Sequence, residues 1–154
     1  MRVSAVHPDS RLADHLASAD RCAGDKLGPP LATWNGAMIA MIQRHPASGE
    51  LWLTVSHDAG GSAGPVGEDS AIITEGFALL GGALPPRHTV AVDGVDPNDA
   101  DVVMGGGAWI AAIKLGTVPA VTTTIRDGDG RIDWTHLWNL PNVRVATHRD
   151  DKAP

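Results

Sequence analysis

The sequence contains no tyrosine, one phenylalanine and one cysteine among its 154 residues. The single cysteine, Cys22, cannot form a disulfide within the chain, which is typical of a protein from a reducing compartment. A lone cysteine near a helix end is more often a small packing residue than a reactive thiolate, so we do not expect Cys22 to be a nucleophile. Because other aromatics are nearly absent, five tryptophans must supply almost all of the aromatic packing.

Long apolar runs and clusters of basic residues are also missing. No stretch approaches the roughly 18 apolar residues of a membrane span, and charges interrupt residues 1–20, where a secretory signal would place its apolar segment. Eighteen acidic and twelve scattered basic residues give a formal charge of −6, which argues against a cationic surface for nucleic acid. We therefore expect a cytoplasmic protein with neither a membrane nor a nucleic-acid partner.

The length and the 43% share of hydrophobic residues are sufficient for one hydrophobic core. We expect a single domain over residues 1–154, with a helix at about 9–24, a β-rich body at 32–148 and a frayed tail at 149–154. Asp9 or Ser10 is placed to cap the helix, and Gly24 is placed to end it in a left-handed conformation.

Short apolar runs separated by turn residues dominate the rest of the chain. Residues 37–43 and 51–56 predict a hairpin, and residues 120–134 predict another around the turn sequence DGDG. The glycine-rich segment 58–70 is typical of a loop, and 71–82 predicts a strand with a bulge at Gly76. With further strands near 88–94, 102–115 and 143–147, the pattern predicts a mostly β fold. It would be a β-sandwich or small barrel of eight or nine short strands with one N-terminal helix, and the alternative is an α+β fold.

Two heptapeptides resemble each other: GAMIAMI at 36–42 and GAWIAAI at 107–113 agree at five of seven positions. Each is followed by a proline and a further apolar strand, which is compatible with a duplicated hairpin about a pseudo-twofold axis. The alternative is chance repetition in a β protein rich in alanine, isoleucine and glycine.

The second heptapeptide overlaps a glycine triplet, Gly105, Gly106 and Gly107. If residues 107–115 formed a helix instead of a strand, the triplet would be a candidate anion-binding turn at the helix N-terminus. No Lys-Ser/Thr pair follows it, so the motif lacks the rest of a phosphate loop.

Seven histidines suggest acid–base or metal chemistry, but none of them forms an H-x-H or H-x-x-x-H pair. Asp58 follows His57 directly, and Asp133 lies three residues before His136. A hydrolase or lyase pocket beneath the glycine-rich loop at 59–67 would contain four candidate catalytic residues: His57, Asp58, His88 and His136.

The segment DGDGRID contains three closely spaced carboxylates, Asp127, Asp129 and Asp133, which make it a weak candidate for a cation site. It does not match a complete EF-hand loop, because the closing glutamate position is occupied by His136. A hairpin turn explains the same residues without a metal, so we expect neither a metal nor a cofactor.

Alternation along the predicted strands places Trp52 and Trp134 on the face opposite their aliphatic neighbours. If those neighbours form the core, the two rings lie outward, and together with Trp109 and Trp138 they are candidates for a binding surface. The alternative is that the helix or a second sheet covers that face.

We favour a non-enzymatic β-rich module that contacts another protein, or a second copy of itself, through an acidic surface and exposed tryptophans, as an assembly or inhibitory subunit. Two alternatives remain open. One is the small hydrolase or lyase with the histidine and aspartate pocket, and the other is a binder of small anionic ligands at the glycine triplet.

Overall fold

The fold is known from a computed structural model, which describes residues 15–17, 19–21, 24, 26–36, 38–57, 60–66, 71–74 and 76–141. Residues 15–17 and 19–21 are helical, and eleven strands make up most of the remainder. The predicted class, mostly β with one N-terminal helix, is confirmed.

The strands form three antiparallel sheets. The first sheet has the order β1-β2-β3-β4: Ala32–Asn35, Ile39–Arg44, Leu51–His57 and Gly60–Pro65. The middle sheet has the order β5-β6-β9-β8: Ile72–Ile73, Phe77–Ala83, Ala108–Lys114 and Ala100–Gly105. The third sheet has the order β11-β10-β7: Ile132–Asn139, Ala120–Arg126 and Thr89–Asp93, and a short 3₁₀ turn, Pro97–Asp99, precedes β8.

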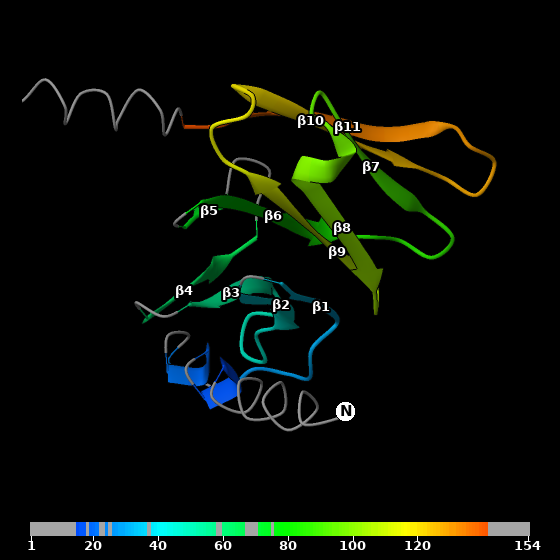
Figure 1. The fold of residues 1–154 in the computed structure, drawn as a ribbon. Coiled ribbons are helices and arrows are strands. Elements are labelled where there is room, and N and C mark those ends of the chain that lie inside the picture. Colours follow the sequence, from blue (N-terminus) through cyan, green and yellow to red (C-terminus); the bar gives the residue numbers. More distant parts are fainter. Residues whose placement is uncertain are drawn as a thin grey trace, which may run out of the picture.

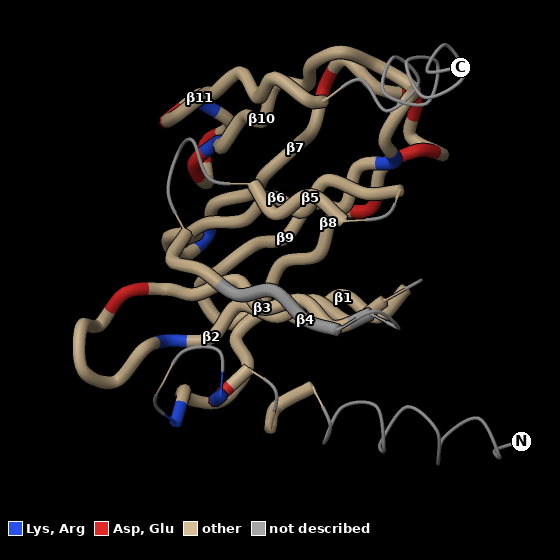
Figure 2. The backbone as a smooth tube through the Cα atoms, turned by 90° about the vertical axis from the view of Figure 1, so that its left-hand side faces the viewer, with Lys and Arg blue, Asp and Glu red and all other residues tan. Residues whose placement is uncertain are grey.

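The three sheets are stacked, and the helical segment covers the outer face of the first sheet (Figure 1). The middle sheet is therefore covered on both faces, which explains its sequence. Six of the seven residues of β9, AWIAAIK, are buried, and only Lys114 at its end is exposed. A strand buried on both faces carries a continuous apolar run instead of an alternating one. Charged residues lie mainly on loops and on the outer layers, as Figure 2 shows.

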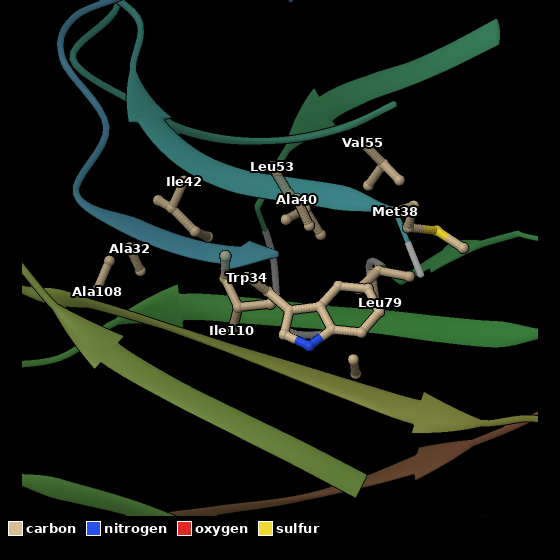
Figure 3. Packing of buried hydrophobic residues seen from close by; sticks show 11 residues of the cluster. Ala32, Trp34, Met38, Ala40, Ile42, Leu53, Val55, Leu79, Ala108 and Ile110 are labelled. Atoms are coloured by element: carbon tan, nitrogen blue, oxygen red, sulfur yellow. The ribbon is translucent and has the colours of Figure 1, made fainter. Parts of the chain in front are cut away.

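One core cluster fills the space between the first and middle sheets. The indole of Trp34 lies there beside Leu79 and Ile110 (Figure 3). Its Nε1 donates a hydrogen bond to Oδ2 of Asp101 on β8 at 3.1 Å, and its ring lies 5.3 Å from that of Phe77. Trp34 thus links the two sheets by packing and by a polar contact.

A second core cluster fills the space between the middle and third sheets. Its buried members include Leu80 and Ile113 from the middle sheet and Val121 and Ile125 from the third. The sheets therefore enclose two separate cores, one on each face of the middle sheet.

The two predicted hairpins, β2 with β3 and β10 with β11, are present. The left-handed residue predicted at the helix end is also observed, since Gly24 has φ +72°. Asp9, Ser10, the predicted strand at 143–147 and the tail at 149–154 lie outside the described residues.

Two strand predictions need correction. The glycine-rich segment 58–70 includes β4, which pairs with β3 over Gly60–Pro65; backbone pairing to a neighbouring strand outweighs the low β-propensity of glycine here. Gly76 is not a bulge within one strand. It has φ +92° and lies in the turn that joins β5 to β6, two strands of a hairpin.

The topology does not support a duplicated hairpin. The strand after GAMIAMI, β3, pairs with β2, whereas the strand after GAWIAAI, β10, lies in a different sheet from β9. The leading glycines also have different roles. A Cβ at Gly36 would lie 2.5 Å from the Trp34 ring, while Gly107 adopts φ +86° in a turn. The heptapeptides resemble each other because β2 and β9 are both buried inner strands.

The glycine triplet is a hairpin turn between two strands. Gly106 and Gly107 both have positive φ, +62° and +86°, which is typical of the two-residue turn that suits the twist of antiparallel strands. Residues 108–114 are strand β9, so the helix N-terminus on which the anion site depended is absent. A Cβ at Gly106 would lie 2.8 Å from the backbone of Leu31, so the turn packs against the start of β1.

No helix within the described residues is both long enough and apolar enough to cross a membrane.

Candidate functional site

A cavity of about 330 Å³ is lined mainly by residues of the middle and third sheets, and Val66, which follows β4 of the first sheet, also borders it. Three tryptophans line it: Trp109 from β9, and Trp134 and Trp138 from β11. Its remaining walls are small or aliphatic except for one carboxylate, that of Asp133. The volume lies within the range of about 300–1,000 Å³ that is typical of sites for small molecules.

Two adjacent glycines of β6, Gly81 and Gly82, line the cavity on the middle sheet. Gly82 is paired with Trp109 across the β6–β9 ladder, and the indole lies over it. A Cβ at Gly82 would approach Nε1 of that indole to 2.9 Å, so the ring position requires glycine there. At Gly81 a Cβ would meet Ile42 at 2.7 Å on the opposite face. The glycine pair thus lets large side chains pack closely on both faces of β6.

The Nε1–H of Trp109 has no hydrogen-bond acceptor among the described residues, although the side chain is only 1% exposed. A buried donor without a partner costs about 1–3 kcal/mol. The indole is therefore held beside the cavity by packing alone, at a cost in stability.

On the third sheet, Trp134, His136 and Trp138 occupy alternate positions of β11 and share its inner face. The imidazole of His136 lies between the two indoles, with ring centroids 5.7 Å from Trp134 and 4.7 Å from Trp138. Trp138 is fixed further, because its Nε1 donates to the hydroxyl of Thr123 at 2.8 Å. This row of rings forms one wall of the second core.

A β-bulge places Asp133 at the cavity. Arg126 is paired with Ile132 and Ile125 with Trp134, so Asp133 is the extra residue on β11. A bulge redirects side chains that strict alternation would send to the other face. This explains why Asp133 and its neighbour Trp134 both line the cavity.

His88, in the loop before β7, contacts Asp133. Its Nε2 lies 3.1 Å from Oδ2 of Asp133, and its Nδ1 lies 2.9 Å from the carbonyl oxygen of Pro86. Both partners are acceptors, so both ring nitrogens must carry protons to satisfy them. The hydrogen bond to the Pro86 carbonyl raises the pKa of His88 above its usual value of 6.5; desolvation opposes this rise, and the contact with Asp133 and the charge of Asp127 add to it. Both contacts therefore favour the protonated imidazolium over the neutral ring.

This geometry does not assemble the predicted catalytic pocket. His57 ends β3 of the first sheet, whereas His136 lies on the third sheet, with the middle sheet between them. Asp58 lies outside the described residues, as does the side chain of His57. His88 uses both ring nitrogens in hydrogen bonds, and the described cavity wall contains no serine, threonine, cysteine or lysine nucleophile.

The hairpin turn between β10 and β11 accounts for the carboxylates that were candidates for a cation site. Oδ1 of Asp127 accepts hydrogen bonds from the backbone N–H groups of Asp129 and Arg131 at 2.9 and 3.0 Å, which closes the β10–β11 turn with Gly130 at φ +85°. Asp133 pairs with His88 instead. In the part of the chain that the structure describes, no three histidine, cysteine, aspartate or glutamate residues are arranged to bind a metal ion.

The predicted exposure of the tryptophans is wrong. Trp109 and Trp138 are 1% and 4% exposed, and Trp134 is half-buried at the cavity. Trp52 does lie on the face of β3 opposite Leu53, but that face is covered by the helical segment, and the ring is half-buried beside His45 at 5.4 Å. The alternative of a covered face therefore describes the observed packing.

Sequence reasoning missed the glycine pair, the bulge and the contact between His88 and Asp133. The glycine pair had a signal, since two glycines inside an apolar strand often mark a close approach of other groups. No local pattern indicates which histidine meets which carboxylate, because residues 88 and 133 are joined only by the third-sheet pairing of β7, β10 and β11.

Comparison of the chain with protein-family models, with curated proteins and with solved structures found no match.

Proposed function

We propose that this chain is a cytoplasmic protein that binds a small, largely apolar molecule in the cavity between the middle and third sheets. The observation that carries the proposal is the lining: three indoles and a glycine pair surround about 330 Å³, with a single carboxylate among the lining residues. Concave, mostly apolar sites with few polar groups are the usual form of small-molecule pockets. The single cysteine supports the cytoplasmic assignment.

Two further observations support a binding role over a purely structural one. The turn at the cavity rim is strained, because Arg87, close to Pro85 of the lining, has the unusual φ of +65° for a residue other than glycine. Strained backbone concentrates at functional sites. Binding also requires no nucleophile, which agrees with the described cavity wall.

The test is a titration with the neutral fluorescent probe N-phenyl-1-naphthylamine, whose emission rises in apolar sites. We expect saturable binding to the wild-type chain and about tenfold weaker binding to Trp134→Ala, since an indole wall contributes on the order of 1–2 kcal/mol. The matched control is Leu137→Ala, because Leu137 is 56% exposed on the other face of the same strand. Failure of the wild-type chain to bind the probe, or equal affinities of the two variants, would refute the proposal.

The protein-contact function predicted from the sequence remains a second candidate, with a different surface. Ile132 and Leu137 of β11 are 60% and 56% exposed, and β11 is an edge strand of the third sheet in the described part of the chain. Exposed apolar side chains on an edge strand favour pairing with another chain. Sedimentation velocity tests this: association of the wild-type chain that is lost in Leu137→Asp supports the candidate, and a monomer at all concentrations opposes it.

A further inference from the structure

We infer that the ligand of the cavity is a small organic cation, an ammonium group with alkyl substituents, held by the tryptophan rings and by Asp133. The inference rests on the proposed small-molecule function and specifies the chemical class of the ligand.

The aromatic lining is the first argument. Trp109, Trp134 and Trp138 all border one cavity, and they come from two facing sheets. The face of an indole carries partial negative charge, and tryptophan is the best of the aromatic side chains for attracting a cation. Sites that bind quaternary ammonium groups commonly surround them with such rings.

The charge at the rim is the second argument. Asp133 is the one charged residue among the described lining residues, and the cavity has no basic side chain in that lining. Its Oδ2 lies 3.1 Å from Nε2 of His88. A carboxylate has two acceptor oxygens, so Asp133 retains capacity to pair with a ligand cation. An anionic ligand would find no basic side chain among the described lining residues to pair with.

The scarcity of hydrogen-bonding groups is the third argument. A sugar would also stack on indoles, but each of its hydroxyls needs a partner when it leaves water. Apart from Asp133, the lining side chains are glycine, alanine, valine, proline, isoleucine and tryptophan. An alkylated ammonium group has methyl or methylene groups on its surface, so it can enter such a site without leaving polar atoms of its own unpaired.

The experiment compares two molecules of the same shape that differ in charge: choline and its carbon analogue 3,3-dimethylbutan-1-ol. Each is titrated against wild-type protein preloaded with N-phenyl-1-naphthylamine, and displacement is measured at pH 8. We expect choline to bind about tenfold more tightly than the neutral analogue. Equal affinities, or tighter binding of the neutral analogue, would overturn the inference while leaving small-molecule binding intact.

Two variants test whether Asp133 causes the preference for choline. Asp133→Asn removes the rim charge with little change of shape, and we expect the preference for choline to fall several-fold. Asp129→Asn removes the same charge from the same hairpin at a residue outside the lining, so we expect it to keep the preference. A preference reduced equally by both variants would show general attraction to a protein of charge −6 instead of recognition by Asp133. Absence of probe binding to the wild-type chain would instead refute the proposed function itself.

Discussion

Gly82 and Trp109 face each other across the β6–β9 ladder, and a Cβ on Gly82 would lie 2.9 Å from Nε1 of the indole. The tryptophan covers the glycine, and the ring so placed forms one wall of the cavity. The two residues are neighbours in the sheet although they lie 27 positions apart in the sequence (109 − 82).

The first prediction concerns this pair. Gly82→Ala should displace a buried ring and destabilise the protein by about 1–3 kcal/mol, the usual cost of overpacking. Urea unfolding followed by tryptophan fluorescence measures the change. Gly64→Ala in β4 is the matched control, because no atom lies within 4 Å of the position of its Cβ, and it should stay within about 0.5 kcal/mol of wild type. A Gly82→Ala protein as stable as Gly64→Ala would contradict the observed ring position.

The second prediction separates backbone strain from steric contact in two turns. Gly106→Ala combines positive φ with a Cβ only 2.8 Å from Leu31 backbone atoms, whereas Gly130→Ala has positive φ and nothing within 4 Å. Strain alone costs about 1 kcal/mol, so we expect Gly130→Ala to lose about that amount and Gly106→Ala to lose clearly more. Thermal melts of the two variants compare them, and equal melting temperatures would contradict the packing of the β8–β9 turn against Leu31.

The third prediction uses a buried polar chain beneath the helical segment. Nε2 of His15 lies 2.8 Å from the hydroxyl oxygen of Thr54, and that hydroxyl donates to Oε1 of Gln43 at 3.1 Å, so the hydroxyl accepts from His15. This order assigns the proton of neutral His15 to Nε2 and leaves its buried Nδ1 without a partner among the described residues. A second proton on Nδ1 would also be unpaired, so burial lowers the pKa of His15 from 6.5 to about 4.

Because the pKa of His15 is lower in the folded protein, its contribution to stability is complete above pH 6.5 and is lost as the pH falls towards 4. We expect this group to lower the free energy of unfolding by on the order of 1–3 kcal/mol over that interval. Urea unfolding at pH 7, 5.5 and 4 should show a shallower decline for His15→Gln than for wild type. Parallel declines would show that His15 does not titrate as described.

The fourth prediction concerns the turn at the cavity rim, where His88 N–H donates to the Pro85 carbonyl at 3.2 Å and Arg87 has φ +65°. A positive φ at this turn position favours glycine. Arg87→Gly should therefore raise the free energy of unfolding by about 0.5–1 kcal/mol, while Arg87→Ala, which keeps a Cβ, should not. If alanine stabilises the protein as much as glycine does, the strain lies elsewhere.

Much of the fold could be predicted from the sequence. Alternation and turn residues predicted the β10–β11 hairpin, and Gly24 predicted a helix end, because these signals depend on neighbouring residues. The stacking of three sheets could not be predicted in the same way. The run AWIAAI is typical of a strand buried on both faces, as β9 is in the structure, but it is also compatible with a short helix and does not show which sheets cover it.

The site was less predictable than the fold. Alternation alone predicted that Trp52 and Trp134 lie outward. In the structure, the helical segment covers the side of β3 that carries Trp52, and Trp134 faces the middle sheet. Asp133 reaches the cavity only because a bulge breaks the alternation of β11. Burial of a strand face and the position of a bulge both depend on distant segments, so a local pattern does not determine them.

The most direct test of the account is an NMR titration of the five tryptophan indole N–H resonances, assigned by single Trp→Phe variants, with N-phenyl-1-naphthylamine as ligand. The chain provides its own reference, because Trp34 and Trp52 belong to the first sheet and do not line the cavity. We predict that the resonances of Trp109, Trp134 and Trp138 shift together and saturate, while those of Trp34 and Trp52 stay in place. Shifts confined to Trp34 or Trp52, or no saturable shift at all, would contradict a ligand site between the middle and third sheets.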